Sequence, residues 1–128
     1  NDDPFWWNAA EPIWVTAERQ GVRTATMFWP GSNVNWGGTK PNKWPMTFEG
    51  GARPQDWQMF NQQVTGEQRV NAVLAWMRRP ARIRPRLVTL YFDTVDTAGH
   101  AYGPDDPRTT AAVADIDKLI GMLVDGLK

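Results

Sequence analysis

The chain has 128 residues, of which 41% are hydrophobic and eight are tryptophan. Its 14 basic and 14 acidic side chains balance, so charge gives no case for a nucleic-acid polymer as a partner. The absence of cysteine excludes disulfide scaffolds, thiolate metal sites and cysteine nucleophiles. No apolar run approaches the roughly 18 residues of a membrane span, so none is expected. The opening residues, Asn1 to Pro4, read like the interior of a longer protein, and we expect a fragment.

The first half of the chain predicts one helix, one strand and a long loop. Pro12 suits the first turn of a helix, which is expected over about 12–20. Its expected apolar face consists of Ile13, Trp14 and Ala17. The run 22–29 is rich in β-branched and aromatic residues, which predicts a strand. Residues 31–64 contain many glycines and prolines without any period, so we expect a long loop that forms a site wall or carries an insertion.

The second half predicts two helices around a second strand. Thr65 and Gln68 match a capping box, and helical spacing continues from there until Pro80. The run 87–92 is apolar on both faces, which suits a parallel strand buried between helix layers. A last helix is expected from Asp106 to about residue 125. Its apolar stripe consists of Val113, Ile116, Ile120, Leu123, Val124 and Leu127.

The order of these elements favours an α/β fold with parallel strands, because helices and strands alternate along the chain. The two strands should be adjacent, or separated by one position that a strand from elsewhere would fill. Two strands alone leave both edges of the sheet open, which again indicates that further strands belong to the same domain.

The second strand leads into the residues with the most distinctive chemistry, Asp96 and His100. In open α/β folds ligands bind at the carboxyl edge of the sheet, where these residues are expected. A carboxylate and an imidazole four residues apart, on one loop or one helical turn, can reach a single first-row metal ion, and Gly99 would let the backbone turn tightly. Two ligands do not complete a site, and nearby carboxylates could add to it: Asp93, Asp105 and Asp106. The alternative is a carboxylate at a helix start beside a surface or hydrogen-bonded histidine.

Residues 91–104 read Y-F-D-T-V-D-T-A-G-H-A-Y-G-P, which resembles a signature of the nucleotide pyrophosphatase/phosphodiesterase family in the alkaline phosphatase superfamily. Three further blocks agree in the same order: 11–17, 28–32 and residues 69–76 of the helix that follows Thr65. The resemblance covers nearly the whole chain and fails only around 49–63. It implies a partial alkaline-phosphatase-like three-layer sandwich, with residues 1–128 as an internal segment of a single catalytic domain.

The resemblance also implies a chemistry. In that family two zinc ions bridge a phosphate, and a threonine attacks phosphorus to form a covalent intermediate that water hydrolyses. Carried over by motif, Asp96 and His100 match two ligands of one zinc, whereas the threonine and the remaining ligands lie outside this chain. Tyr91 matches a tyrosine that faces the substrate, and Trp44 or Phe48 matches an aromatic that stacks on the nucleotide base.

The implied partners are a nucleotide or other phosphodiester small molecule and the remaining parts of the parent domain, in a periplasmic or extracellular setting. Two other interpretations stay open. The chain could be a catalytically inactive fragment whose aromatic residues bind a partner, or its parent could be a phosphomonoesterase or sulfatase of the same superfamily. The long block at 91–104 favours the phosphodiesterase over the latter.

Overall fold

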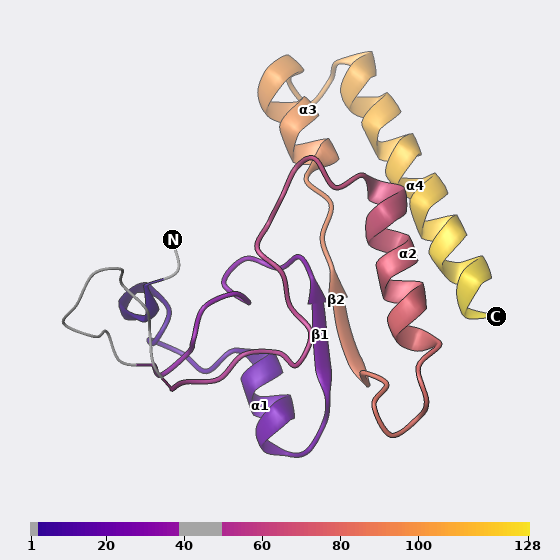
Figure 1. Ribbon diagram of the computed structural model, residues 1–128. Helices are drawn as coiled ribbons and strands as arrows, with labels where there is room; N and C mark the ends of the chain where they lie inside the picture. The colour runs from indigo at the N-terminus through magenta and orange to yellow at the C-terminus, as the bar shows by residue number, and fades with distance from the viewer. Residues whose placement is uncertain (1–2, 39–49) are drawn as a thin grey trace. The chain divides into compact units, whose positions relative to one another are not determined.

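A computed structural model describes residues 3–38 and 50–128 (Figure 1). Its elements are the 3-10 helix η1 (Pro4–Trp6), α1 (Ile13–Arg19), β1 (Thr24–Met27), α2 (Gly66–Met77), β2 (Leu87–Leu90), α3 (Thr94–Tyr102) and α4 (Pro107–Leu127). The chain divides into two compact units. We call them the sheet unit, Asn1–Phe60 with Pro80–Thr89, and the helical unit, Asn61–Arg79 with Leu90–Lys128.

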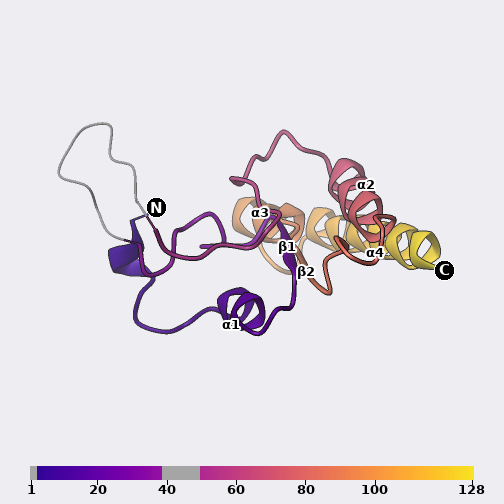
Figure 2. The same ribbon diagram turned by 60° about the horizontal axis from the view of Figure 1, so that its bottom comes forward.

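The sheet unit contains the two strands, which are adjacent and parallel as the sequence predicts (Figures 1 and 2). Their pairing begins where Arg86 N donates to Arg23 O at 2.8 Å. All four residues of β1 are buried, and α1 contacts this strand. The residues of β2 are only half-buried, so the expectation of a strand covered on both faces is not met within this chain.

Residues 50–60 form an irregular segment that is nevertheless tied to the rest of the sheet unit. Asp56 makes a parallel bridge with Ala25, and Thr26 N donates to Asp56 O at 2.8 Å. Trp36 and Ala52 form a separate antiparallel bridge. The predicted loop is therefore anchored by backbone hydrogen bonds at two points. Its residues 39–49 lie outside the described part of the chain.

The apolar face expected for the first helix is wrong at one position. Ile13 is 64% exposed, whereas Trp14 and Val15 are buried. The helix has seven residues, and its contact with β1 selects the side that carries Trp14 and Val15. A helix this short has no second repeat in the sequence that would fix which side faces inward.

Helix α2 of the helical unit begins with the predicted capping box. Thr65 Oγ1 accepts from Gln68 N at 3.2 Å, and Gln68 Oε1 accepts from Thr65 N at 2.9 Å. Helix α4 packs against both α2 and α3. Gly66 and Gly126 allow the close approach of α2 and α4, because a Cβ at either position would come within 2.4 Å of a leucine methyl of the facing helix.

That packing buries only part of the stripe expected on α4, because Ile116 and Leu123 are half-buried. Thr109 and Ala112 are buried, whereas much of the predicted stripe is exposed within the described chain. The exposed apolar residues on α4 are Val113, Ile120, Val124 and Leu127. The physical reason is that the contact with α2 places Leu119 of α4 against Gly66 and Leu74 of α2 against Gly126.

Of the two possibilities for the segment after β2, a loop or a helical turn, the structure shows a helix. Residues 94–102 form the helix α3, which ends at Gly103 with φ of 88°. Gly99 lies inside this helix and does not adopt a positive φ, so it makes no tight turn. Among the described residues, no helix is long and apolar enough to cross a membrane.

Substitution Thr65→Ala should lower the free energy of unfolding by about 1 kcal/mol, because it removes the acceptor for the Gln68 backbone amide. Thr65→Ser keeps a hydroxyl in the same place and should stay close to the parent protein. Urea unfolding of the three proteins measures this difference. Equal stabilities for Thr65→Ala and the parent would show that the capping box contributes nothing.

Candidate metal centre

Asp96 and His100 lie on one side of α3, because residues four apart in a helix share a face. Asp96 Oδ1 and His100 Nε2 are 3.4 Å apart, and both side chains are largely exposed, at 68% and 83%. This distance is longer than the roughly 2.7–3.2 Å of an ordinary N–H···O hydrogen bond. The two side chains are therefore close, but the distance between them is too long for an ordinary hydrogen bond.

The separation of these two atoms fits a shared zinc ion. A tetrahedral zinc holds oxygen and nitrogen ligands at about 2.0–2.2 Å, which places two ligand atoms roughly 3.4 Å apart. Asp96 and His100 show that separation without any rearrangement. One carboxylate oxygen and one imidazole nitrogen also form a donor set that zinc accepts. The pair fits half of a tetrahedral shell.

A shallow hollow of about 300 Å³ adjoins this pair. It is lined by Asp96, Gly99, His100 and Pro104. A Cβ at Gly99 would meet no atom within 4 Å, so no packing in this chain requires glycine there. The missing side chain instead leaves open space in the hollow beside the two candidate ligands.

The carboxylates considered as further ligands do not join the pair. Asp93 binds Arg69 at 2.8 Å, and Asp106 caps α4 and binds Arg108 at 2.9 Å. The hydrogen bonds from Arg108 hold the pKa of Asp106 below its ordinary value. Within residues 3–38 and 50–128, no three carboxylate or histidine side chains gather closely enough to hold a metal ion. Any complete shell would need ligands other than these.

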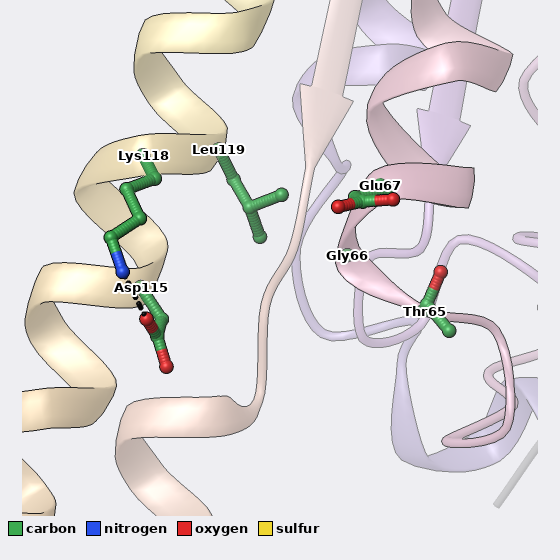
Figure 3. A pocket seen from close by; sticks show the side chains of 6 residues that line it. All are labelled: Thr65, Gly66, Glu67, Asp115, Lys118 and Leu119. Carbon is green, nitrogen blue, oxygen red and sulfur yellow. Dashed lines mark hydrogen bonds and ion pairs between the residues drawn. The ribbon is translucent and has the colours of Figure 1, made fainter.

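A second hollow in the helical unit, of about 470 Å³, lies between the start of α2 and the middle of α4 (Figure 3). Its lining residues are Thr65, Gly66, Glu67, Asp115, Lys118 and Leu119. Lys118 Nζ donates to Asp115 Oδ1 at 2.8 Å, and this hydrogen bond raises the pKa of Lys118. The ion pair neutralises the lysine that lines the hollow, so its charge does not favour an anion.

Of the two predicted substrate-binding residues, Tyr91 and Trp44, the structure describes only Tyr91. Tyr91 directly follows β2 and is half-buried, and its carbonyl oxygen accepts from Arg69 Nη1 at 3.1 Å. Trp44 and Phe48 lie outside the described residues. Their proposed contacts with a substrate stay predictions.

Sequence reasoning missed the buried ion pair between Arg69 and Asp93. Arg69 is 3% exposed although it carries a full charge. Burial acts to raise the pKa of Asp93, but hydrogen bonds from Arg69 and Gln62 outweigh that effect and lower it. The available signal was an arginine directly before Val70, on the side of α2 that also carries the buried Val73.

The family model for type I phosphodiesterase / nucleotide pyrophosphatase matches residues 1–128. The chain belongs to this family. It is 39% identical over 128 residues to an uncharacterised pyrophosphatase/phosphodiesterase of Schizosaccharomyces pombe. It is 40% identical over 122 residues to human ectonucleotide pyrophosphatase/phosphodiesterase family member 1. These alignments use 100% and 95% of this chain, and 24% and 12% of the relatives.

A solved structure of a family member confirms the fold. Murine ectonucleotide pyrophosphatase/phosphodiesterase 5, in an inactive form in complex with AMP, superposes with a TM-score of 0.81 at 28% identity. The superposition covers 98% of this chain and 30% of the murine chain. The predicted α/β class and its alkaline-phosphatase-like architecture are therefore correct, at partial coverage. The chain spans less than a third of the proteins that it resembles.

The lowered pKa of Asp93 predicts how stability changes with pH. A carboxylate whose pKa is lower in the folded state contributes stability above its unfolded pKa of about 3.9 and loses it as pH falls through the folded value. The unsubstituted protein should therefore have a larger free energy of unfolding than Asp93→Asn at pH 7. This difference in free energy should shrink below about pH 4. Urea unfolding at pH 7 and pH 3 measures it, with Asp117→Asn on the exposed side of α4 as the control. A difference that is the same at both pH values would contradict the role of this ion pair.

Proposed function

We propose that the chain is part of a zinc-dependent nucleotide pyrophosphatase/phosphodiesterase, in which Asp96 and His100 bind one of two zinc ions. The observation that carries the proposal is the 3.4 Å separation of Asp96 Oδ1 and His100 Nε2 on one face of α3. Membership of the phosphodiesterase family supports it, because the matched region contains both residues. The reaction is hydrolysis of phosphodiester or pyrophosphate bonds, with a threonine outside this chain as the nucleophile.

A zinc ion at this pair would supply a Lewis acid and lower the pKa of a bound water. Asp96 provides an anionic oxygen, and His100 provides Nε2 as a neutral donor. Their exposure leaves room for the further ligands that a tetrahedral shell needs. The space beside Gly99 leaves the approach to the ion open on the side of the hollow.

The expected substrate is a nucleotide or another small phosphodiester. The AMP complex of the murine relative supports a nucleotide. Tyr91 and Trp44 are the proposed contacts, with Tyr91 facing the substrate and Trp44 stacked on the base. The remaining parts of the parent domain would supply the other ligands. The ectonucleotide pyrophosphatase names of two relatives support an extracellular location.

The alternative of a catalytically inactive binding module has one supporting observation. Aromatic side chains of the sheet unit are exposed within the described chain, with Phe5 at 76% and Trp6 at 67%. Exposed aromatic groups of this size suit a contact with other protein. Such contacts are equally expected where a segment meets the rest of its own domain, so they do not outweigh the metal geometry.

The full-length protein should hydrolyse a chromogenic nucleotide diester in the presence of zinc, and His100→Ala should lower kcat/KM by more than about 100-fold. Loss of an outer-sphere group at a metal centre costs about 10–100-fold, and loss of a direct ligand should cost more. The 128-residue chain alone should be inactive, because one aspartate and one histidine cannot stabilise both the attacking and the leaving oxygen.

The control variant is Asp117→Asn, which removes an exposed carboxylate from α4 and should leave hydrolysis unchanged. Turnover by the isolated chain would show that the nucleophile is misplaced. An unimpaired His100→Ala variant of the full-length protein would show that this histidine is only a surface residue of α3.

A further inference from the structure

The buried guanidinium of Arg69 connects three segments of the helical unit. Its Nε donates to Val64 O at 2.9 Å, in the turn before α2. Its Nη1 donates to Tyr91 O at 3.1 Å and to Asp93 Oδ1 at 2.8 Å. One rigid planar group therefore fixes the distance between α2 and the residues that lead into α3.

Asp93 occupies the N-cap position of α3 but does not cap it. An aspartate at this position normally accepts a hydrogen bond from a backbone amide of the first turn. Here its side chain makes no such bond. Oδ1 instead accepts from Arg69, and Oδ2 accepts from Gln62 Nε2 at 3.1 Å. The carboxylate joins the start of α3 to α2 and to the segment before it.

The position of α3 matters because this helix carries both candidate metal ligands. Asp96 is three residues beyond Asp93, within the first turn of α3, and His100 lies one turn further along. The carbonyl of Asp93 accepts from Thr97 N at 2.8 Å, so the first turn of α3 is hydrogen-bonded directly to this residue. A displacement of Asp93 relative to α2 is therefore transmitted to both candidate ligands.

We propose that Arg69 and Asp93 are positioning residues for the metal pair, an inference that rests on the proposed function. The ion pair sets where α3 presents Asp96 and His100 to ligands from the rest of the domain. Zinc sites tolerate deviations of only about 0.2 Å in ligand distance, so a small shift of α3 weakens the shell.

The other end of α3 is held independently, which limits how far the helix can move. Thr109 Oγ1 donates to Gly103 O at 2.8 Å, and the guanidinium of Arg108 lies 3.6 Å from the ring centre of Tyr102. Loss of the Arg69 contacts should therefore tilt α3 about this corner rather than unfold it. A tilt moves Asp96, near the free end, more than it moves Tyr102.

Stability alone does not account for this arrangement. Replacing a buried ion pair with neutral groups of similar volume is often neutral or stabilising, whereas removing one partner leaves an uncompensated charge. Replacing both residues together can therefore separate an effect on the position of α3 from an effect on the stability of the fold. Arg69→Met with Asp93→Asn removes both charges, keeps the bulk of the arginine stem and leaves an acceptor for Gln62.

The test measures zinc affinity of the full-length protein by competition with a chromophoric chelator, alongside thermal unfolding of the zinc-free form. The double variant should unfold within a few degrees of the parent, yet bind one zinc equivalent about 10–100-fold more weakly. Asp115→Asn, which breaks the exposed ion pair with Lys118 in the same unit, is the matched control and should bind zinc normally.

His100→Ala distinguishes this inference from the proposed function. If His100→Ala weakens zinc binding and the double variant does not, the positioning role is wrong and the metal site stands. If His100→Ala leaves zinc binding unchanged, the metal assignment itself is wrong. Weaker binding in both, with normal binding in Asp115→Asn, supports the positioning role.

Discussion

The contact on which the helical unit depends is the guanidinium of Arg69 against Asp93 and the carbonyl of Tyr91. A charged group that is almost completely buried needs a partner and further hydrogen bonds, since an isolated charge in the interior costs several kcal/mol. Arg69 obtains them from the end of one strand and the start of the next helix. The same contacts that satisfy its charge therefore determine where α3 begins.

The four-residue spacing on α3 brings the two candidate metal ligands together. Asp96 and His100 share a face of α3 because they are four residues apart, and their donor atoms stand at the separation that a tetrahedral zinc requires. In the proposed site the pair would supply only part of a shell, and the chain spans 24% of one relative and 12% of another. Half of a site is expected where a segment meets the remainder of its domain.

Much of the fold was predictable from local signals. The capping box at Thr65 and the alternation of helix and strand gave α2 and the parallel strands correctly, because both depend on neighbouring residues. For the segment of α3 the sequence left a loop and a helical turn both open, because Asp93 at its start makes no side-chain cap and pairs with the distant Arg69. The buried side of α4 was predicted only in part, because glycine contacts with α2 shift it.

The binding of one zinc ion by Asp96 and His100 is tested most directly by anomalous diffraction from crystals of the full-length, zinc-loaded protein. Data collected on both sides of the zinc absorption edge locate each ion independently of any assumption about its ligands. We expect a zinc peak about 2.0–2.2 Å from both the Asp96 carboxylate and His100 Nε2. Zinc peaks elsewhere in the protein, with none beside these two side chains, would contradict the metal assignment.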